Sequence, residues 1–135
     1  MIDNKNNIPW IEKYRPESLN DLCGNYEIIN RLKNMKNSGD VSNMILVGPS
    51  GTGKTSSILS LAKDLLGETF SEAIIELNAS DERGIDIVRN KIKNFSLKKI
   101  NFTEFKYKII ILDEADSMTP SAQQALRRTI ESYTN

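Results

Sequence analysis

The sequence contains no histidine among its 135 residues. This absence excludes imidazole acid–base catalysis, Ser-His-Asp hydrolysis and His-ligated zinc. Cysteine is nearly absent as well, because Cys23 is the only one, so the chain can form neither an intrachain disulfide nor a cysteine-based zinc site. The chemistry of any site must therefore depend on carboxylates, lysine, arginine and hydroxyl groups.

Long apolar runs are also absent. The longest cover four residues, Met44–Val47 and Ile109–Leu112, whereas a helix needs about 20 apolar residues to span a bilayer. The N-terminal segment Met1–Trp10 is polar and lacks the apolar centre of a secretory signal. We therefore expect no membrane partner and a soluble protein in a reducing compartment.

Neither sign of charge is in excess. Eighteen basic residues balance 18 acidic residues, so the net charge is zero. This balance excludes a uniformly basic nucleic-acid binder and an acidic tail protein, although it allows a local basic patch. The length suits one globular domain. We expect residues 1–9 to be flexible and the rest of the chain to be folded.

Apolar spacing predicts short buried strands that alternate with amphipathic helices. Unbroken apolar runs predict strands over Met44–Val47 and Ile109–Leu112, and the mostly apolar stretch Ala73–Leu77 predicts another. Apolar residues spaced by three or four predict helices over Asn25–Asn37, Lys54–Leu66, Gly84–Phe95 and Pro120 to about Tyr133. This alternation is typical of an α/β fold, in which helical crossovers join the strands of a parallel sheet.

Helix-capping and helix-terminating residues indicate where several predicted elements begin and end. Gly39 is a plausible helix stop, and Thr119 is a good N-cap because Pro120 follows it at the first helical position. Proline disfavours helix at the preceding residue, so Trp10–Pro16 is predicted to be extended, with two aromatic anchors. Ser18–Leu22 is predicted to form a short helical turn.

Residues 48–55 read Gly-Pro-Ser-Gly-Thr-Gly-Lys-Thr and fit the pattern G-x-x-x-x-G-K-[ST]. The glycines let the backbone turn tightly, so that several N–H groups point at one anion, and the following helix adds its positive N-terminal end. In this motif Lys54 reaches the β- and γ-phosphates, and the Thr55 hydroxyl binds Mg²⁺. The motif stands between a predicted strand and a predicted helix, which favours a phosphate-binding loop over a plain glycine-rich turn.

Two carboxylates follow the strand predicted over Ile109–Leu112. A buried parallel strand delivers the residues after it to the carboxyl edge of the sheet, where ligands bind. Asp113 is placed there to hold Mg²⁺, directly or through water, and Glu114 to orient and polarise an attacking water. Alone, such a pair would favour a solvated strand end. Beside a phosphate-binding loop, it favours nucleotide hydrolysis.

A basic stretch runs from Arg89 to Lys108, with seven basic residues and one acidic residue. Arg89 and Lys93 are four residues apart and share one face of the predicted helix. Such a face suits either contact with nucleic-acid phosphates or simple solvation, and the residues alone leave both readings open. Arg127 and Arg128 form a second, smaller basic site.

Three further stretches are diagnostic: Trp10–Pro16, Glu76–Ile85 and Ala122–Glu131. Together with the phosphate-binding loop and Asp113–Asp116, they resemble the ordered sequence boxes of the replication factor C small subunits, which are clamp-loader ATPases of the AAA+ type. The resemblance covers nearly all of the chain after residue 8. It implies that residues 10–135 form the N-terminal portion of an AAA+ ATPase domain, which has a P-loop NTPase fold with a parallel sheet and helical crossovers.

The resemblance also implies a function. The protein would be an ATP-binding and ATP-hydrolysing subunit of a hetero-pentameric sliding-clamp loader, which acts in DNA replication in the nucleus. Its cofactors would be ATP and Mg²⁺. Its partners would be the other loader subunits, the sliding clamp and primer–template DNA. The alternative is a non-hydrolysing DNA-binding or assembly module of the same complex.

The family motifs give roles to individual positions. Lys54, Asp113 and Glu114 match catalytic positions, and Thr55 and Asp113 match the metal site. The positions that match the nucleotide site are Tyr14, Arg15, Cys23 and Gly24 at the adenine and ribose end, and Gly48, Pro49, Ser50, Gly51, Thr52, Gly53, Lys54, Thr55 and Ser56 at the phosphates. The expected DNA-contacting residues are Arg83, Arg89, Lys93, Arg127 and Arg128.

The sequence departs from the family pattern in two ways. Ser50 stands where the family usually has proline, with little expected effect because that position contributes backbone to the loop. The fourth and fifth strands and the helical lid are missing after Asn135, so we expect the chain to be part of a longer protein. Met44–Val47 and Ile109–Leu112 would then lack the strand that lies between them in the family, and their edges would expose backbone groups and apolar side chains. We expect weak nucleotide binding and little turnover from this chain alone.

Overall fold

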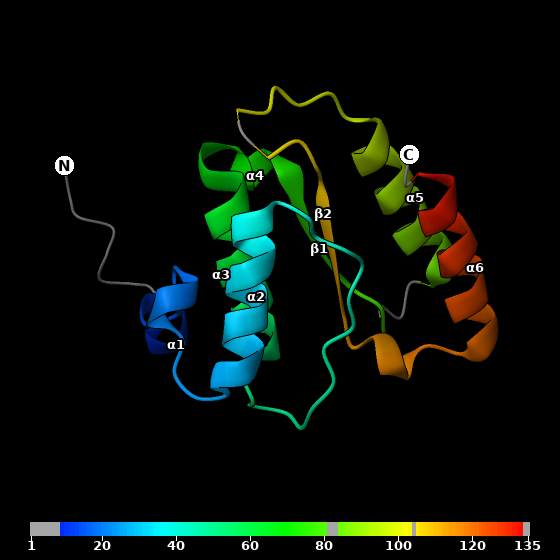
Figure 1. Cartoon of the computed structure of the whole chain (residues 1–135). Coiled ribbons are helices and arrows are strands. Elements are labelled where there is room, and N and C mark those ends of the chain that lie inside the picture. The colour runs from blue at the N-terminus through cyan, green and yellow to red at the C-terminus, as the bar shows by residue number, and fades with distance from the viewer. Residues whose placement is uncertain (1–8, 81–83, 104, 134–135) are drawn as a thin grey trace. The chain divides into compact units, whose positions relative to one another are not determined.

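The structure is a computed structural model, and it describes residues 9–80, 84–103 and 105–133 (Figure 1). Apart from Pro9, the segment predicted to be flexible lies outside the described residues. The chain divides into two compact units, Met1–Gly67 and Glu68–Asn135. Each unit is described below by itself.

The first unit is helical over its described residues. Its elements are α1 (Trp10–Lys13), the 3-10 helix η2 (Leu19–Asp21), α2 (Tyr26–Ser38) and α3 (Lys54–Leu66), and the short 3-10 helix η3 (Gly67–Thr69) follows. The helices predicted over residues 25–37 and 54–66 are confirmed, as is the turn near Ser18. Gly39 ends α2 with φ 68°, a left-handed conformation that glycine adopts readily, so the predicted stop is also confirmed.

The prediction of an extended segment over Trp10–Pro16 is wrong for its first four residues, which form α1. The Lys13 N–H donates to the Pro9 carbonyl at 2.9 Å, and the Tyr14 N–H donates to the Trp10 carbonyl at 3.1 Å. Pro16 restricts only the residue before it, so a helical turn can end ahead of it. The two aromatic residues are not buried anchors, because Trp10 and Tyr14 are 78% and 64% exposed.

The prediction of a strand over Met44–Val47 is also wrong, because residues 41–49 have no regular secondary structure. A strand is held by hydrogen bonds to a neighbour, and no strand pairs with this segment within the described part of the chain. Ile45 and Val47 are 87% and 90% exposed. The expected exposure of apolar side chains is therefore seen here.

The second unit contains the sheet. Its elements are α4 (Phe70–Ala73), β1 (Ile74–Asn78), α5 (Ile85–Leu97), β2 (Ile109–Asp113), the 3-10 helix η4 (Ala115–Ser117) and α6 (Pro120–Ser132). The predicted strands and helices of this unit are confirmed, with ends that shift by one or two residues. β1 and β2 pair in parallel, as predicted, from Ile74 opposite Ile109 to Asn78 opposite Asp113.

Two helices share a core with this sheet. Leu77 of β1 clusters with Val88 and Ile92 of α5, with Met118, and with Leu126 of α6. The predicted N-cap of α6 is confirmed, because the Thr119 hydroxyl accepts a hydrogen bond from the Ala122 N–H at 3.3 Å. The core and this cap fix the ends of α5 and α6 relative to the strand ends.

The Lys108 side chain contacts the C-terminal end of α5. Its ammonium donates to the carbonyls of Phe95 at 3.0 Å and Ser96 at 2.6 Å, and also to the Lys98 carbonyl. Burial lowers the pKa of Lys108, and the nearby positive charge of Lys98 lowers it further. The ammonium satisfies carbonyls that the helix end leaves without intrahelical partners.

We expect Lys108→Met to destabilise the chain by about 1–2 kcal/mol, because it removes both the cation and the donors at a helix C-terminus. Urea denaturation followed by circular dichroism measures the change. Lys106→Met is the matched control, since Lys106 is exposed and its replacement should cost less than about 0.5 kcal/mol. Equal losses for the two variants would contradict the capping role.

Candidate functional site

The phosphate-binding loop belongs to the first unit and has the tight backbone that its glycines predict. Gly51 and Gly53 adopt φ of 78° and 85°, which side chains disfavour. At Gly48 a Cβ would lie 3.2 Å from the Thr52 hydroxyl oxygen. A side chain at any of these three positions would strain or crowd the loop.

Lys54 and Thr55 are the first two residues of α3, directly after the loop. The Lys54 ammonium folds back over the loop and donates to the carbonyls of Gly48 at 2.7 Å and Pro49 at 2.8 Å. The Thr52 hydroxyl also donates to the Pro49 carbonyl, at 2.8 Å. The loop therefore combines a cation with the positive end of a 13-residue helix, the arrangement that suits a phosphate group.

The residues expected at the adenine and ribose end lie on either side of η2 in the same unit. Tyr14 and Arg15 precede this turn, while Cys23 and Gly24 follow it. Tyr14 and Cys23 are exposed, and Arg15 is half-buried. Ser50 is exposed in the loop and Ser56 is half-buried in the first turn of α3. Their contacts with a nucleotide remain predictions.

The acidic pair lies at the carboxyl end of β2, in the second unit. Asp113 is the last residue of the strand, and its carboxylate accepts a hydrogen bond from the Glu114 N–H at 3.0 Å. Glu114 adopts φ 53°, which is uncommon for a residue with a side chain. This left-handed turn ends the strand and sets the direction in which the Glu114 side chain leaves the sheet.

Asn78 at the end of β1 and Ser80 just after it lie beside this pair, and the sequence reasoning did not give them a role. Ser80 Oγ lies 2.6 Å from Glu114 Oε2 and 2.6 Å from Asn78 Oδ1. The Ala79 N–H donates to the Asp113 carbonyl at 2.9 Å, which extends the pairing past the strand end. The sequence did contain a signal for them: Asn78 and Ser80 come directly after the strand predicted over Ala73–Leu77, and the carboxyl ends of parallel strands meet at one edge.

The two residues predicted to bind Mg²⁺ have the chemistry that this ion prefers. Hydroxyl and carboxylate oxygens are hard ligands of the kind Mg²⁺ prefers, and this ion is usually held by one or two carboxylates together with substrate phosphates. Thr55 in the first unit carries a hydroxyl and Asp113 in the second unit carries a carboxylate, so each has the type of donor that was predicted for it. Across residues 9–80, 84–103 and 105–133, no group of three or more His, Cys, Asp or Glu forms a metal site of its own.

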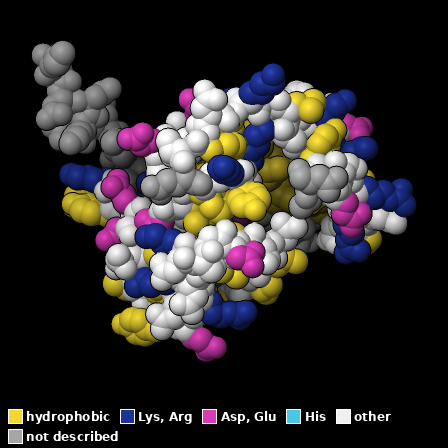
Figure 2. Space-filling model, turned by 45° about the horizontal axis from the view of Figure 1, so that its top comes forward, with side chains coloured by type: hydrophobic (Ala, Val, Ile, Leu, Met, Phe, Trp, Pro, Cys, Tyr) yellow, Lys and Arg dark blue, Asp and Glu magenta, His cyan; other side chains and the backbone are white. Residues whose placement is uncertain are grey.

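Three of the predicted DNA-contacting residues lie around one hollow of about 450 Å³ beside α5 and α6. The residues that line this hollow, here called the α5–α6 groove, are Asp86, Arg89, Asn90, Lys93, Arg128, Thr129, Ser132 and Tyr133. Several basic side chains are visible on the right of Figure 2, where Figure 1 has these helices. Arg127 is exposed on α6 but does not line the groove, and Arg83 lies outside the described residues.

Arg89 is held in this groove by two contacts. Its Nε donates to the Thr129 hydroxyl at 3.3 Å, and its Nη1 lies 3.6 Å from Asp86 Oδ1. Both side chains of the ion pair are substantially exposed, at 49% for Arg89 and 86% for Asp86, so the pair is worth little energetically. The guanidinium therefore stays accessible to an incoming anion.

No helix in the described part of the chain is both long enough and apolar enough to cross a membrane. This finding agrees with the short apolar runs of the sequence.

Known proteins with similar sequences point to one family. Residues 44–135 match the ATPase family associated with various cellular activities (AAA). Replication factor C subunit 2 of Arabidopsis thaliana is 58% identical over 96% of the chain and 39% of its own length. Replication factor C subunit 4 of Saccharomyces cerevisiae is 55% identical over 95% of the chain and 40% of its own length. The replication factor C small subunit of Saccharolobus solfataricus is 50% identical over 94% of the chain and 38% of its own length.

The chain thus spans about two fifths of the length of the curated relatives it matches. The resemblance to replication factor C small subunits is confirmed by these identities. The predicted α/β P-loop fold is confirmed by the family match and by the parallel pairing of β1 with β2. On this basis, the chain belongs to the AAA family of ATPases.

Proposed function

We propose that the protein is an ATP-hydrolysing subunit of a sliding-clamp loader in nuclear DNA replication. It would couple ATP binding and hydrolysis to the loading of a ring-shaped clamp at primer–template junctions. The observation that carries the proposal is the joint presence of the phosphate-binding loop and of Asp113 and Glu114, in a chain whose relatives are replication factor C subunits.

Nucleotide binding would be shared between two parts of the first unit. The loop N–H groups, Lys54 and the start of α3 would take the phosphates. The residues on either side of η2, namely Tyr14, Arg15, Cys23 and Gly24, would take the base and the ribose. Thr55 and Asp113 would hold Mg²⁺. This ion would neutralise the negative charge that develops on the phosphates during hydrolysis.

Glu114 would orient and polarise the water that attacks the γ-phosphate. A carboxylate can accept a hydrogen bond from this water and so align it for in-line displacement. In the structure Glu114 Oε2 contacts the Ser80 hydroxyl at 2.6 Å, and a contact of this length restricts the position of the carboxylate. Ser80 would thus position the catalytic carboxylate of Glu114, and Asn78 would act on it only through its contact with Ser80.

The proposed partners are the other subunits of a hetero-pentamer, the clamp and primer–template DNA. A neighbouring subunit would complete the ATP site with an arginine finger. Loss of such a finger typically lowers the rate by ~10³–10⁵, which is why we expect little turnover from this chain alone. The basic α5–α6 groove would follow DNA phosphates without reading the sequence, because lysine and arginine contacts to the backbone carry no base information.

Lys54→Ala is expected to abolish ATP binding, because it removes the only side-chain cation of the phosphate-binding loop. Isothermal titration of the purified protein with ATP and Mg²⁺ measures the affinity. Lys33→Ala, which removes the same charge from α2, is the matched control and should leave the affinity within about twofold. Unchanged binding by Lys54→Ala would disprove the assignment of the loop.

Glu114→Gln is expected to retain ATP binding but to block hydrolysis, because an amide oxygen polarises water far less than a carboxylate does. Phosphate release by the assembled complex measures the rate, and we expect a loss of at least about 100-fold. Asp116→Asn is the control, since Asp116 lies in η4 and is exposed. Normal hydrolysis by Glu114→Gln would refute the water-positioning role, and no hydrolysis by the wild type would favour the non-hydrolysing module.

Arg89→Glu is expected to weaken DNA binding and to reduce the slope of log affinity against log salt by about one phosphate contact. Fluorescence anisotropy with primer–template DNA at several salt concentrations measures both quantities. Lys91→Glu makes a similar charge change on α5, but Lys91 does not line the α5–α6 groove. If the two variants change the slope equally, the groove is not the DNA-contacting surface.

A further inference from the structure

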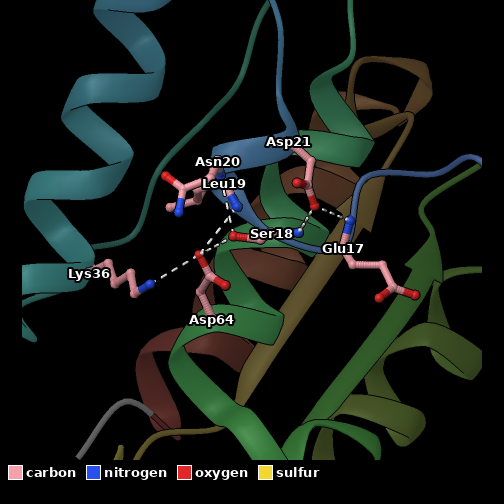
Figure 3. Close-up of polar contacts among 7 residues, drawn as sticks. All are labelled: Glu17, Ser18, Leu19, Asn20, Asp21, Lys36 and Asp64. Atoms are coloured by element: carbon pink, nitrogen blue, oxygen red, sulfur yellow. Dashed lines mark hydrogen bonds and ion pairs between the residues drawn. The ribbon is translucent and has the colours of Figure 1, made fainter.

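The Asp64 carboxylate, near the end of α3, joins three elements of the first unit (Figure 3). Its Oδ2 accepts hydrogen bonds from the Leu19 N–H at 3.2 Å and from the Ser18 hydroxyl at 3.4 Å. The Lys36 ammonium, from α2, lies 3.2 Å from the same oxygen. One side chain thus holds together α2, the start of η2 and α3.

A second contact is made from the same face of α3, one turn earlier. Ser60 is fully buried, and its hydroxyl donates to the Pro16 carbonyl at 3.3 Å. Residues four apart in a helix lie one above the other, so Ser60 and Asp64 act side by side. The segment Pro16–Leu19 is therefore attached to α3 at two points.

This segment is stiff in itself. The Ser18 hydroxyl accepts a hydrogen bond from the Asn20 N–H at 3.3 Å, and the Asp21 carboxylate accepts from the N–H groups of Ser18 at 3.0 Å and Glu17 at 3.3 Å (Figure 3). Leu19 is only 1% exposed. A turn with its own capping box and a buried leucine moves as one piece, so Asp64 positions the whole turn.

The setting of Asp64 favours a role in orientation over simple packing. Its side chain is 14% exposed, and that of Lys36 is 37% exposed. Leu61 and Leu65, its neighbours on α3, are buried. A carboxylate in such surroundings needs paired donors to offset the lost hydration, and the directions of those donors then fix one arrangement. An apolar side chain would pack here without imposing any direction on the turn.

We propose that Asp64 is a positioning residue for the base end of the nucleotide, an inference that rests on the proposed function. Tyr14 and Arg15 come just before the turn that Asp64 holds, and Cys23 and Gly24 come just after it. The phosphate-binding residues begin α3, about 15 Å away along the same helix axis. α3 therefore connects both ends of the ligand, with Lys54 at one end and Asp64 at the other.

The experiment compares two ligands that share only the phosphates, ADP and inorganic tripolyphosphate, each titrated calorimetrically into the protein in its native length. Asp64→Ala is expected to weaken ADP binding about tenfold, because the turn would hold the binding arrangement only about a tenth of the time. Tripolyphosphate affinity is expected to stay within about twofold, since the loop is unchanged. Asp40→Ala, which removes an exposed carboxylate from the same unit, is the control and should change neither affinity.

Two further variants test the role of the charge and replace Asp64→Ala if it does not fold. Asp64→Glu keeps the charge and should recover part of the ADP affinity. If Asp64→Ala does not fold, Asp64→Asn replaces it, since the amide keeps the size and an acceptor but loses the charge opposite Lys36. We expect that variant to weaken ADP binding selectively as well, by a smaller factor.

The outcomes separate this inference from the proposed function. Equal weakening of both ligands, or unchanged ADP binding in a folded variant, would overturn the positioning role while leaving nucleotide binding intact. If the wild type bound neither ADP nor tripolyphosphate, the proposed function itself would be wrong, and the inference would fall with it.

Discussion

The common register of β1 and β2 is the constraint on which the second unit depends. Because the strands run in parallel and end at Asn78 and Asp113, their carboxyl ends meet at one edge. The Ser80–Glu114 contact follows directly from that alignment. The same pairing presents Leu77 to α5 and α6, so one hydrogen-bonded ladder sets both the core and the acidic site. A shift by one residue would turn every side chain to the opposite face.

In the first unit the corresponding rigid element is α3. A helix resists bending, so residues at its two ends keep a fixed separation. The phosphate-binding loop leads into its first turn, while Ser60 and Asp64 hold the Pro16–Leu19 segment near its last turn. The phosphate-binding loop and the segment Pro16–Leu19 are far apart in the sequence, but in the structure both are attached to α3.

The sequence predicted the features that local chemistry determines. Gly39 and Pro120 fix helix ends by their backbone preferences, and Thr119 does so by its side-chain hydroxyl. The long helices and both paired strands follow from apolar residues in the sequence. The prediction for Trp10–Lys13 was wrong because a single helical turn is too short to show a periodic pattern in the sequence. The strand prediction for Met44–Val47 was wrong because a strand forms only beside a neighbouring strand, and a local sequence pattern does not show whether such a neighbour is present.

The site residues divide in the same way. Lys54, Asp113 and Glu114 lie in motifs with fixed spacing and could be found from sequence. Asp64 could not, because its partners Ser18 and Leu19 are 46 and 45 positions away. Ser80 lies 34 positions from Glu114. Contacts of this kind form only when the chain folds, and the presence of a serine or an aspartate in the sequence does not predict which distant residue it will contact.

The exposed segment around Ile45 and Val47 has a consequence for the behaviour of the chain in solution. It presents unpaired backbone groups beside apolar side chains, the surface on which another copy can add a strand. The net charge of zero and pI near 6.3 give copies little mutual repulsion at neutral pH. An exposed apolar stretch of this kind therefore favours association between copies as the protein concentration rises.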